Sequence, residues 1–186
     1  MVSIPSLWLP ILVAAVLVFV VSSLVHMVLG WHRADYSALP DEAATLETLG
    51  RQSLAPGLYP FPYCPDHKQM GTPEVQAKFA KGPVGFVTVI PSGPPNMGVY
   101  LGTWFAFCLV VGVFVAYLTG RTLAPGAPYL AVHRVAGATA FMAYGLGQVV
   151  DSIWKGQRWG ATFRHVVDGL LYALVTGGAF GWLWPR

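Results

Sequence analysis

The chain has 186 residues, of which 55% are hydrophobic and 10% are charged, and its mean hydropathy is +0.56. An ordinary soluble domain carries about 25% charged residues, and a soluble chain this short could not bury so many apolar side chains. This composition excludes a soluble globular domain, a disordered chain and a disulfide-rich secreted module, and a net charge of +3 is too small and scattered for a nucleic-acid interface. We therefore expect a polytopic membrane protein without a nucleic-acid partner.

The first predicted element is an apolar segment over residues 7–30, which contains no charged residue and has His26 as its only titratable group. A signal peptide would have a basic amino-terminal region, an apolar stretch of about 7–15 residues and a small-residue cleavage site. The segment has none of these features. We predict that it is a retained membrane-spanning helix.

Residues 31–97 are polar enough to lie in water and long enough to form a small subdomain. The β-branched stretch 84–90 predicts a strand, and two prolines restrict the extended stretch 58–63 to an edge strand. A helix is expected between them over residues 73–81, and a shorter helix that precedes both is closed by Gly50. The predicted unit is a two-stranded ribbon with a helix between its strands, which would lean on the membrane surface or on a partner.

Three further apolar segments follow, each near the ~20 residues needed to cross a bilayer. They cover residues 98–120, 127–150 and 166–184. We therefore predict an all-α membrane fold in a single membrane domain of residues 1–186. It is a four-transmembrane-helix bundle with a small α/β juxtamembrane insertion between the first two helices.

The basic residues predict the orientation of these four spans. One side of the membrane would hold both chain ends and Arg121, Arg134 and Arg186. The other side would hold Arg33, Arg51, Lys68, Lys78, Lys81, Lys155, Arg158 and Arg164. Because basic loops stay in the cytoplasm, segments 31–97 and 151–165 are predicted to be cytoplasmic. Both chain ends would then lie outside a bacterial inner (cytoplasmic) membrane.

Small residues recur every four positions in the predicted spans, a spacing that lets helix backbones approach closely in lipid. The second span has Cys108, Gly112, Ala116 and Gly120, and the fourth has Gly169, Ala173, Gly177 and Gly181. The third span has Thr139, Ala143 and Gly147. These stripes predict a tightly packed bundle in which Cys108 is a small packing residue, so a structural disulfide with Cys64 is not expected.

Cys64 and His67 belong to a Cys-Pro-Asp-His sequence, whose side chains include metal-ligand types. A structural zinc site needs four ligands, and no second Cys-x-x-Cys or His-x-His accompanies this motif. A proline-framed turn capped by Asp66 is the simpler interpretation, and a metal site is the alternative.

A second group of polar residues lies at the predicted cytoplasmic ends of the spans. Its members are His26, His32, Asp151, His165 and Asp168. Ionisable groups at membrane depth are costly and often functional, although Asp168 could simply pair with His165 or Arg164, and Asp151 with Lys155. His26 and His165 could also ligate a haem from opposite helices.

Several strings resemble a family of uncharacterised bacterial inner-membrane proteins. They are KGPVGFVTVIPSGPPNMG (81–98), DSIWKGQRW (151–159), FGWLWPR (180–186) and the stretch 7–42. The resemblance covers essentially the whole chain. It implies a membrane protein of this size and supplies no catalytic residue.

No nucleotide-binding, serine-hydrolase or zinc-protease motif occurs, and the paired broken helices of many transporters are missing. We therefore expect a non-catalytic accessory or structural subunit of a larger membrane complex, of respiratory or photosynthetic type, whose partners are other membrane-protein subunits and lipids. No cofactor is predicted. The alternatives are a haem- or metal-binding redox protein, and a small carrier or lipid-binding protein with a bound lipid or pigment.

Overall fold

The computed structural model describes every residue from Met1 to Arg186 and is mostly helical. The chain divides into two compact units. Residues 1–36 and 96–186 form the first unit, which we call the bundle, and Ser37–Pro95 form the second, which we call the insertion.

Two helical segments of the bundle are long and apolar enough to cross a membrane. The first runs over Ile4–Val28 and consists of a 3-10 turn, helix α1 (Trp8–Ser23) and a π-helical turn (Leu24–Val28). The second is helix α4 (Met97–Thr122), which starts where the Asn96 side chain accepts a hydrogen bond from the Val99 amide. These segments coincide with the first two expected spans and indicate a membrane protein.

The third expected span, over residues 127–150, is not one continuous helix. Helix α5 covers Tyr129–Tyr144, a 3-10 turn covers Leu146–Gln148, and the short helix α6 covers Val149–Lys155. The interruption lies where a second helix comes closest. A Cβ atom built on Gly169 would lie 2.4 Å from the Gly145 Cα atom.

The fourth helix is longer than the apolar pattern predicts. Helix α7 covers Trp159–Trp182, whereas the predicted span begins at residue 166. The expected connection over residues 151–165 therefore shrinks to residues 156–158, and Gly156 ends α6 with a φ of +71°. The additional first turns are polar, so a hydropathy criterion leaves them outside the span.

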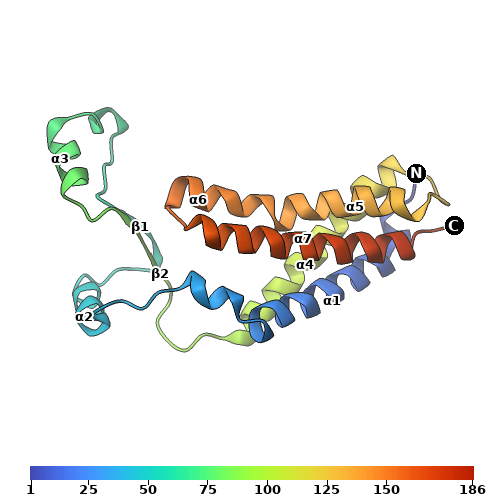
Figure 1. The fold of residues 1–186 in the computed structure, drawn as a ribbon, viewed down its shortest axis with the longest axis horizontal. Coiled ribbons are helices and arrows are strands. Elements are labelled where there is room, and N and C mark those ends of the chain that lie inside the picture. Colours follow the sequence, from blue (N-terminus) through green and yellow to red (C-terminus); the bar gives the residue numbers. More distant parts are fainter. The chain divides into compact units, whose positions relative to one another are not determined.

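The helices α1, α4, α5 and α7 run side by side (Figure 1). Helix α1 contacts α4 and α7, and α5 contacts the same two helices. The Val2 amide donates to the Gly120 carbonyl at 2.8 Å, and the Gly126 amide donates to the Pro185 carbonyl at the same distance. Both chain ends and the α4–α5 loop therefore meet at one end of the bundle.

The bundle core is built on close helix contacts. A Cβ atom on Gly120 would lie 2.5 Å from the Val2 carbonyl oxygen, and one on Gly177 would lie 2.8 Å from the His133 carbonyl oxygen. In α5 the buried positions are Val132, Ala136, Ala140 and Tyr144, whereas Ala143 and Gly147 are exposed. The expected third stripe is therefore one position out of register. Ala136 and Ala140 are also small residues four positions apart. The spacing of small residues alone therefore cannot tell which face of α5 is buried, the one with Ala136 and Ala140 or the one with Thr139 and Ala143.

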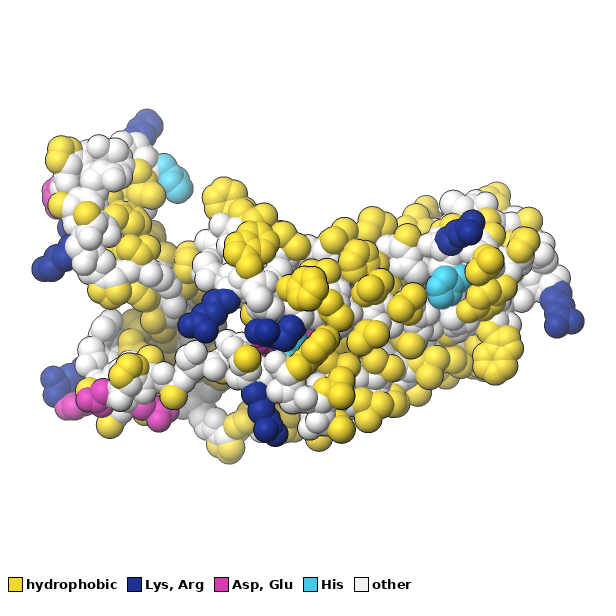
Figure 2. All heavy atoms as spheres, viewed as in Figure 1, with side chains coloured by type: hydrophobic (Ala, Val, Ile, Leu, Met, Phe, Trp, Pro, Cys, Tyr) yellow, Lys and Arg dark blue, Asp and Glu magenta, His cyan; other side chains and the backbone are white.

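The surface of the bundle is strongly hydrophobic. On the face that Figure 2 shows, hydrophobic side chains cover most of the helices, and Lys and Arg side chains gather toward the ends. Exposed large side chains include Leu17, Val20, Val110, Phe114 and Leu174. Such a surface is compatible with a lipid environment.

The insertion contains helix α2 (Glu42–Arg51), strand β1 (Gly57–Phe61), helix α3 (Pro73–Lys81) and strand β2 (Gly85–Val89). The strands are antiparallel, and α3 lies between them in the sequence. The predicted ribbon is thus confirmed. No residue of the insertion is fully buried, so this unit has no closed hydrophobic core.

Candidate metal centre

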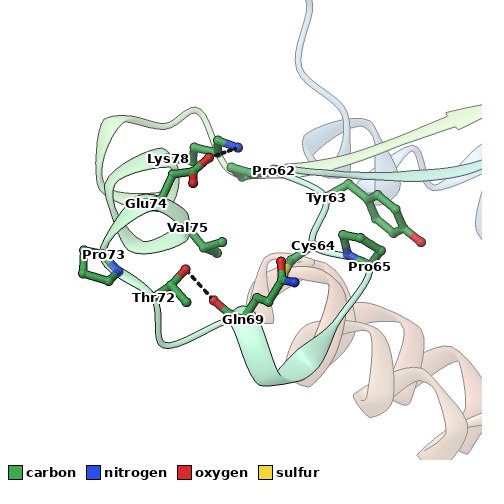
Figure 3. A pocket seen from close by; sticks show the side chains of 10 residues that line it. All are labelled: Pro62, Tyr63, Cys64, Pro65, Gln69, Thr72, Pro73, Glu74, Val75 and Lys78. Carbon is green, nitrogen blue, oxygen red and sulfur yellow. Dashed lines mark hydrogen bonds and ion pairs between the residues drawn. The ribbon is translucent and has the colours of Figure 1, made fainter.

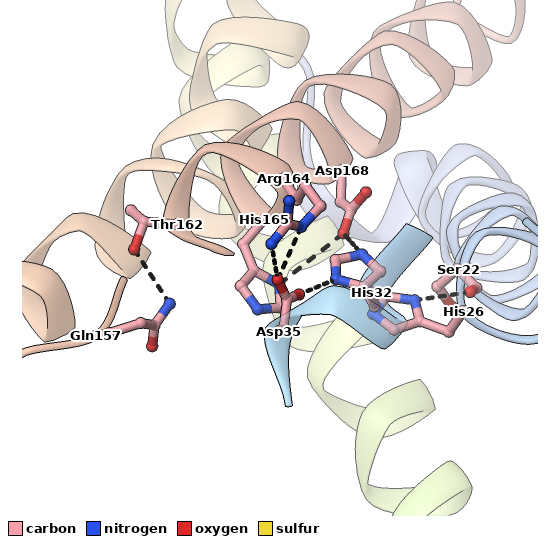
Figure 4. A network of polar contacts seen from close by, with 9 residues as sticks. All are labelled: Ser22, His26, His32, Asp35, Gln157, Thr162, Arg164, His165 and Asp168. Carbon is pink, nitrogen blue, oxygen red and sulfur yellow. Dashed lines mark hydrogen bonds and ion pairs between the residues drawn. The ribbon is translucent and has the colours of Figure 1, made fainter. Parts of the chain in front are cut away.

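A compact polar cluster lies at the end of the bundle that carries the α6–α7 connection. After the π-helical turn, Gly30 adopts a φ of +61° and turns the chain into a 3-10 helix over Trp31–Asp35. This short helix packs against α7, so it brings its own side chains to those near the start of α7 (Figure 4).

His32 is the centre of the cluster. Its Nδ1 atom lies 2.7 Å from Asp35 Oδ2, and its Nε2 atom lies 2.8 Å from Asp168 Oδ2. His32 is 8% exposed and Asp168 only 2%. A carboxylate oxygen thus lies beside each nitrogen of the His32 ring.

Arg164 completes a chain of alternating charges. Its Nε atom donates to Asp35 Oδ1 at 2.7 Å, and its Nη2 atom donates to the same oxygen. The resulting order is Arg164, Asp35, His32 and Asp168 (Figure 4). The Asp35 carboxylate thus has the Arg164 guanidinium as a charged partner, which is the usual condition for a charge that is removed from water.

Asp35 lies outside the candidate membrane spans, and its pKa reflects this chain of contacts. Burial of the carboxyl group raises the pKa, but hydrogen bonds and charge attraction from Arg164 and His32 outweigh burial. The net effect lowers the pKa below the ordinary value of 3.8. The carboxylate is therefore the form that the fold favours.

Three histidines stack in this cluster. The ring centroids of His26 and His32 are 4.5 Å apart with nearly parallel planes, and those of His32 and His165 are 4.9 Å apart. One ligand atom from each of these histidines and one from Asp168 all lie within 4.8 Å of one another. Three imidazole rings and a carboxylate thus lie close enough together to be considered as a ligand group.

This donor set suits a transition-metal ion. In a tetrahedral zinc site with Zn–N bonds of about 2.0–2.1 Å, ligand atoms are roughly 3.3 Å apart, so the side chains would have to approach one another and the stacked rings would have to turn toward a shared ion. Metal-binding histidines usually donate their second N–H to a carboxylate or a backbone carbonyl. His32 Nδ1 meets Asp35, and His26 Nδ1 meets the Ser22 carbonyl at 3.0 Å.

The expected haem ligands His26 and His165 do come together, but His32 lies between them. Its ring stacks on both partners (Figure 4). A porphyrin held between His26 and His165 would have to displace this ring from its two carboxylate contacts. The geometry therefore suits a single metal ion better than a haem.

Asp151 does not join the cluster. Its carboxylate forms a partly exposed ion pair with Lys155 at 2.8 Å, one turn further along α6. This is the simple pairing that the sequence suggests for Asp151. An ion pair of this kind contributes little to stability.

The Cys64–His67 motif forms a turn in the insertion. The Cys64 thiol contacts the Asp66 carbonyl at 3.2 Å, and the Asp66 carboxylate accepts from the Lys68 amide at 2.9 Å. Cys64 lines a surface hollow of about 610 Å³ between this turn and α3, where Glu74 pairs with Lys78 (Figure 3). The hollow does not bring three metal-ligating side chains together.

The central position of His32 and the role of Asp35 do not follow from the sequence. The sequence places His32 in the polar group at the span ends but gives it no central position, and it assigns no role to Asp35. The available signal is local: Gly30 precedes a His and an Asp that are three residues apart. Their encounter with Asp168, far along the chain, depends on helix packing.

Comparison with known protein families, curated proteins and solved structures finds no match to this chain. The resemblance to bacterial inner-membrane proteins stays a prediction. Function is therefore inferred from the geometry of the bundle itself.

Proposed function

We propose that this chain is an integral membrane protein that binds a divalent transition-metal ion through His26, His32, His165 and Asp168. The observation that carries this proposal is the convergence of four ligand atoms within 4.8 Å. The hydrogen bond of His26 adds to it, because it holds the Nδ1 atom and leaves Nε2 for a metal, whereas Nε2 of His32 would exchange its contact with Asp168 for the metal.

We propose that all four main helices lie in the membrane, with α6 continuing the pass of α5. The two long apolar segments and the side-by-side arrangement of α1, α4, α5 and α7 support this topology. Both chain ends would lie outside a bacterial inner membrane, and the insertion would be cytoplasmic, as the distribution of Lys and Arg favours. The metal site would then lie at the cytoplasmic boundary.

Three imidazole nitrogens with one carboxylate oxygen favour Zn²⁺, and also suit Cu²⁺ and Fe²⁺. A metal ion competes with protons for imidazole nitrogens and carboxylate oxygens. Binding therefore releases protons, and we expect the affinity to rise with pH. A redox-active ion would make the site an electron carrier, and Zn²⁺ would make it structural or Lewis-acidic.

Titration of the purified protein with Co²⁺ tests the proposal, because tetrahedral Co²⁺ absorbs visible light. Full-length protein in mild detergent, freed of metal by a chelator, should bind one ion per chain, and Zn²⁺ should displace it. His165→Ala should weaken binding at least about tenfold, since it removes one ligand. His133→Ala is the matched control, because His133 lies on α5 outside the cluster. Equal binding by wild type and His165→Ala would overturn the site.

A second property is supported by the insertion. This unit has no fully buried residue, yet it exposes Leu58, Val84, Phe86 and Ile90. A two-stranded ribbon without a core is marginal in water, so its apolar side chains favour contact with a further surface. We therefore also propose that the chain is a subunit of a larger membrane assembly, which is compatible with metal binding.

A further inference from the structure

A half-open cavity of about 380 Å³ lies between helices of the bundle, and His26 and His165 of the histidine cluster form part of its wall. Its wall is mainly apolar and aromatic and comes from α1 with its π-helical turn, α4, α5 and α7. The residues that matter here are Met27, Leu101, Trp104, Tyr144, Asp168 and Tyr172. A hollow of this size with a few polar groups is typical of small-molecule sites.

Two buried polar atoms in the lining residues have no hydrogen-bond partner within the protein. They are the Oδ1 atom of Asp168 and the hydroxyl of Tyr172. Asp168 is 2% exposed and Tyr172 is 4% exposed. The two residues are one turn apart on α7, so they share a face of the helix. Buried polar groups are nearly always paired, which points to a ligand that supplies the missing partners.

A hydroxyl group fits both atoms at once, because it can donate to Asp168 Oδ1 and accept from the Tyr172 O–H. An ammonium group fits less well, since it can only donate and would leave the Tyr172 O–H donor without an acceptor. The Trp104 indole, which also lines the cavity, already has a partner, because it donates to the Ser22 hydroxyl at 2.9 Å.

The side chains that line the cavity indicate which chemical groups the ligand carries besides its hydroxyl. The ring of Tyr172 lies 6.0 Å from that of Trp104 and 5.6 Å from that of Tyr144, so aromatic rings flank the polar atoms. An aromatic ring of a ligand can make edge-to-face or offset contacts with these side chains. Toward the surface the lining includes Met27, which is 80% exposed, and Leu101, which is 42% exposed. These side chains suit an alkyl tail.

We infer that the cavity binds a lipid-soluble phenol or hydroquinone, whose ring hydroxyl meets Asp168 and Tyr172 and whose tail leaves past Met27 and Leu101. This inference does not rest on the metal proposal, because Tyr172 is not among the four metal ligands. The two sites adjoin, because His26, His165 and Asp168 line the cavity and are also proposed metal ligands.

Binding of a hydroquinone with a decyl tail tests this inference on the full-length protein in mild detergent. Quenching of tryptophan fluorescence and a thermal shift are measured with chelator and again with Zn²⁺. The hydroquinone should bind under both conditions, and its dimethyl ether, which has no hydroxyl donor, should bind at least about tenfold more weakly. This comparison uses the wild-type protein, so it does not depend on a variant that folds.

The Tyr172→Phe variant should weaken hydroquinone binding about five- to tenfold, since it removes one hydrogen-bonding group. Tyr129→Phe is the matched control, because Tyr129 begins α5 and does not line the cavity, and it should leave binding unchanged. Equal binding of the hydroquinone and its ether, or an unchanged affinity of Tyr172→Phe, would overturn the inference. Tighter binding of decylamine than of the hydroquinone would overturn the choice of a hydroxyl over an amine.

Discussion

Asp35 makes the stability of the bundle sensitive to acid. Its pKa is lowered in the folded chain, so the stabilisation from its charged form is complete above the ordinary value of 3.8 and is lost as the pH falls through the folded value. We predict that wild-type protein loses thermal stability when the pH drops below 3.8, and that Asp35→Asn loses less over the same range. Unfolding followed by tryptophan fluorescence in detergent measures both.

At neutral pH, Asp35→Asn should itself destabilise the bundle by about 3 kcal/mol, because it leaves the Arg164 charge without its partner. The control is Asp151→Asn, which breaks only the partly exposed pair with Lys155 and should cost at most about 1 kcal/mol. If the two variants lost stability equally at neutral pH, the chain of charges from Arg164 to Asp168 would have no special role.

The same carboxylate should also tune the metal site. Asp35 accepts a hydrogen bond from His32 Nδ1 and so orients the ring that offers Nε2 to a metal. We predict that Asp35→Asn weakens Co²⁺ binding about 10- to 100-fold while one ion per chain still binds at saturation. Asp151→Asn should leave the affinity unchanged. A change in stoichiometry would instead mean that Asp35 is itself a ligand.

At the scale of the elements, the contact between α5 and α7 depends on glycine. A Cβ atom on Gly169 would lie 2.4 Å from the Gly145 Cα atom, so the two helices would have to separate. On the same helix, a Cβ atom on Gly178 would come no closer than 3.8 Å to the Tyr129 hydroxyl. We predict that Gly169→Ala costs about 1–3 kcal/mol through overpacking, whereas Gly178→Ala causes no loss. Thermal unfolding of both variants measures the difference.

Local patterns predicted several elements closely. The helix over residues 73–81 has the predicted bounds, because a proline at its first position and Gly82 at its end are sufficient signals. The break between α5 and α6 could not be predicted in the same way. Gly145 lies within an apolar stretch, so its sequence surroundings predict one continuous helix. Only the close approach of Gly169 in the folded chain shows why the helix is interrupted there.

At the scale of the whole molecule, the sequence predicted the residue types of the candidate site better than their arrangement. His26, His165 and Asp168 could be grouped because each lies near the same end of a predicted span. Their encounter with His32 needs the turn at Gly30 and the packing of residues 31–35 on α7. These contacts join positions more than a hundred residues apart, and no local rule specifies them.

The proposal that the chain is a subunit of a larger assembly concerns the molecule as a whole. Phe86 is 42% exposed on a ribbon without a core, and an apolar side chain in this position gains stability when a second surface covers it. We predict that the full-length chain, extracted in mild detergent, migrates on a native gel together with another membrane protein in a fixed ratio. Phe86→Asp should weaken that association, whereas Glu42→Asp, an acidic exchange on exposed α2, should not. Migration of the wild-type chain as a monomer alone would contradict the proposal, and the metal site would then belong to a protein that works by itself.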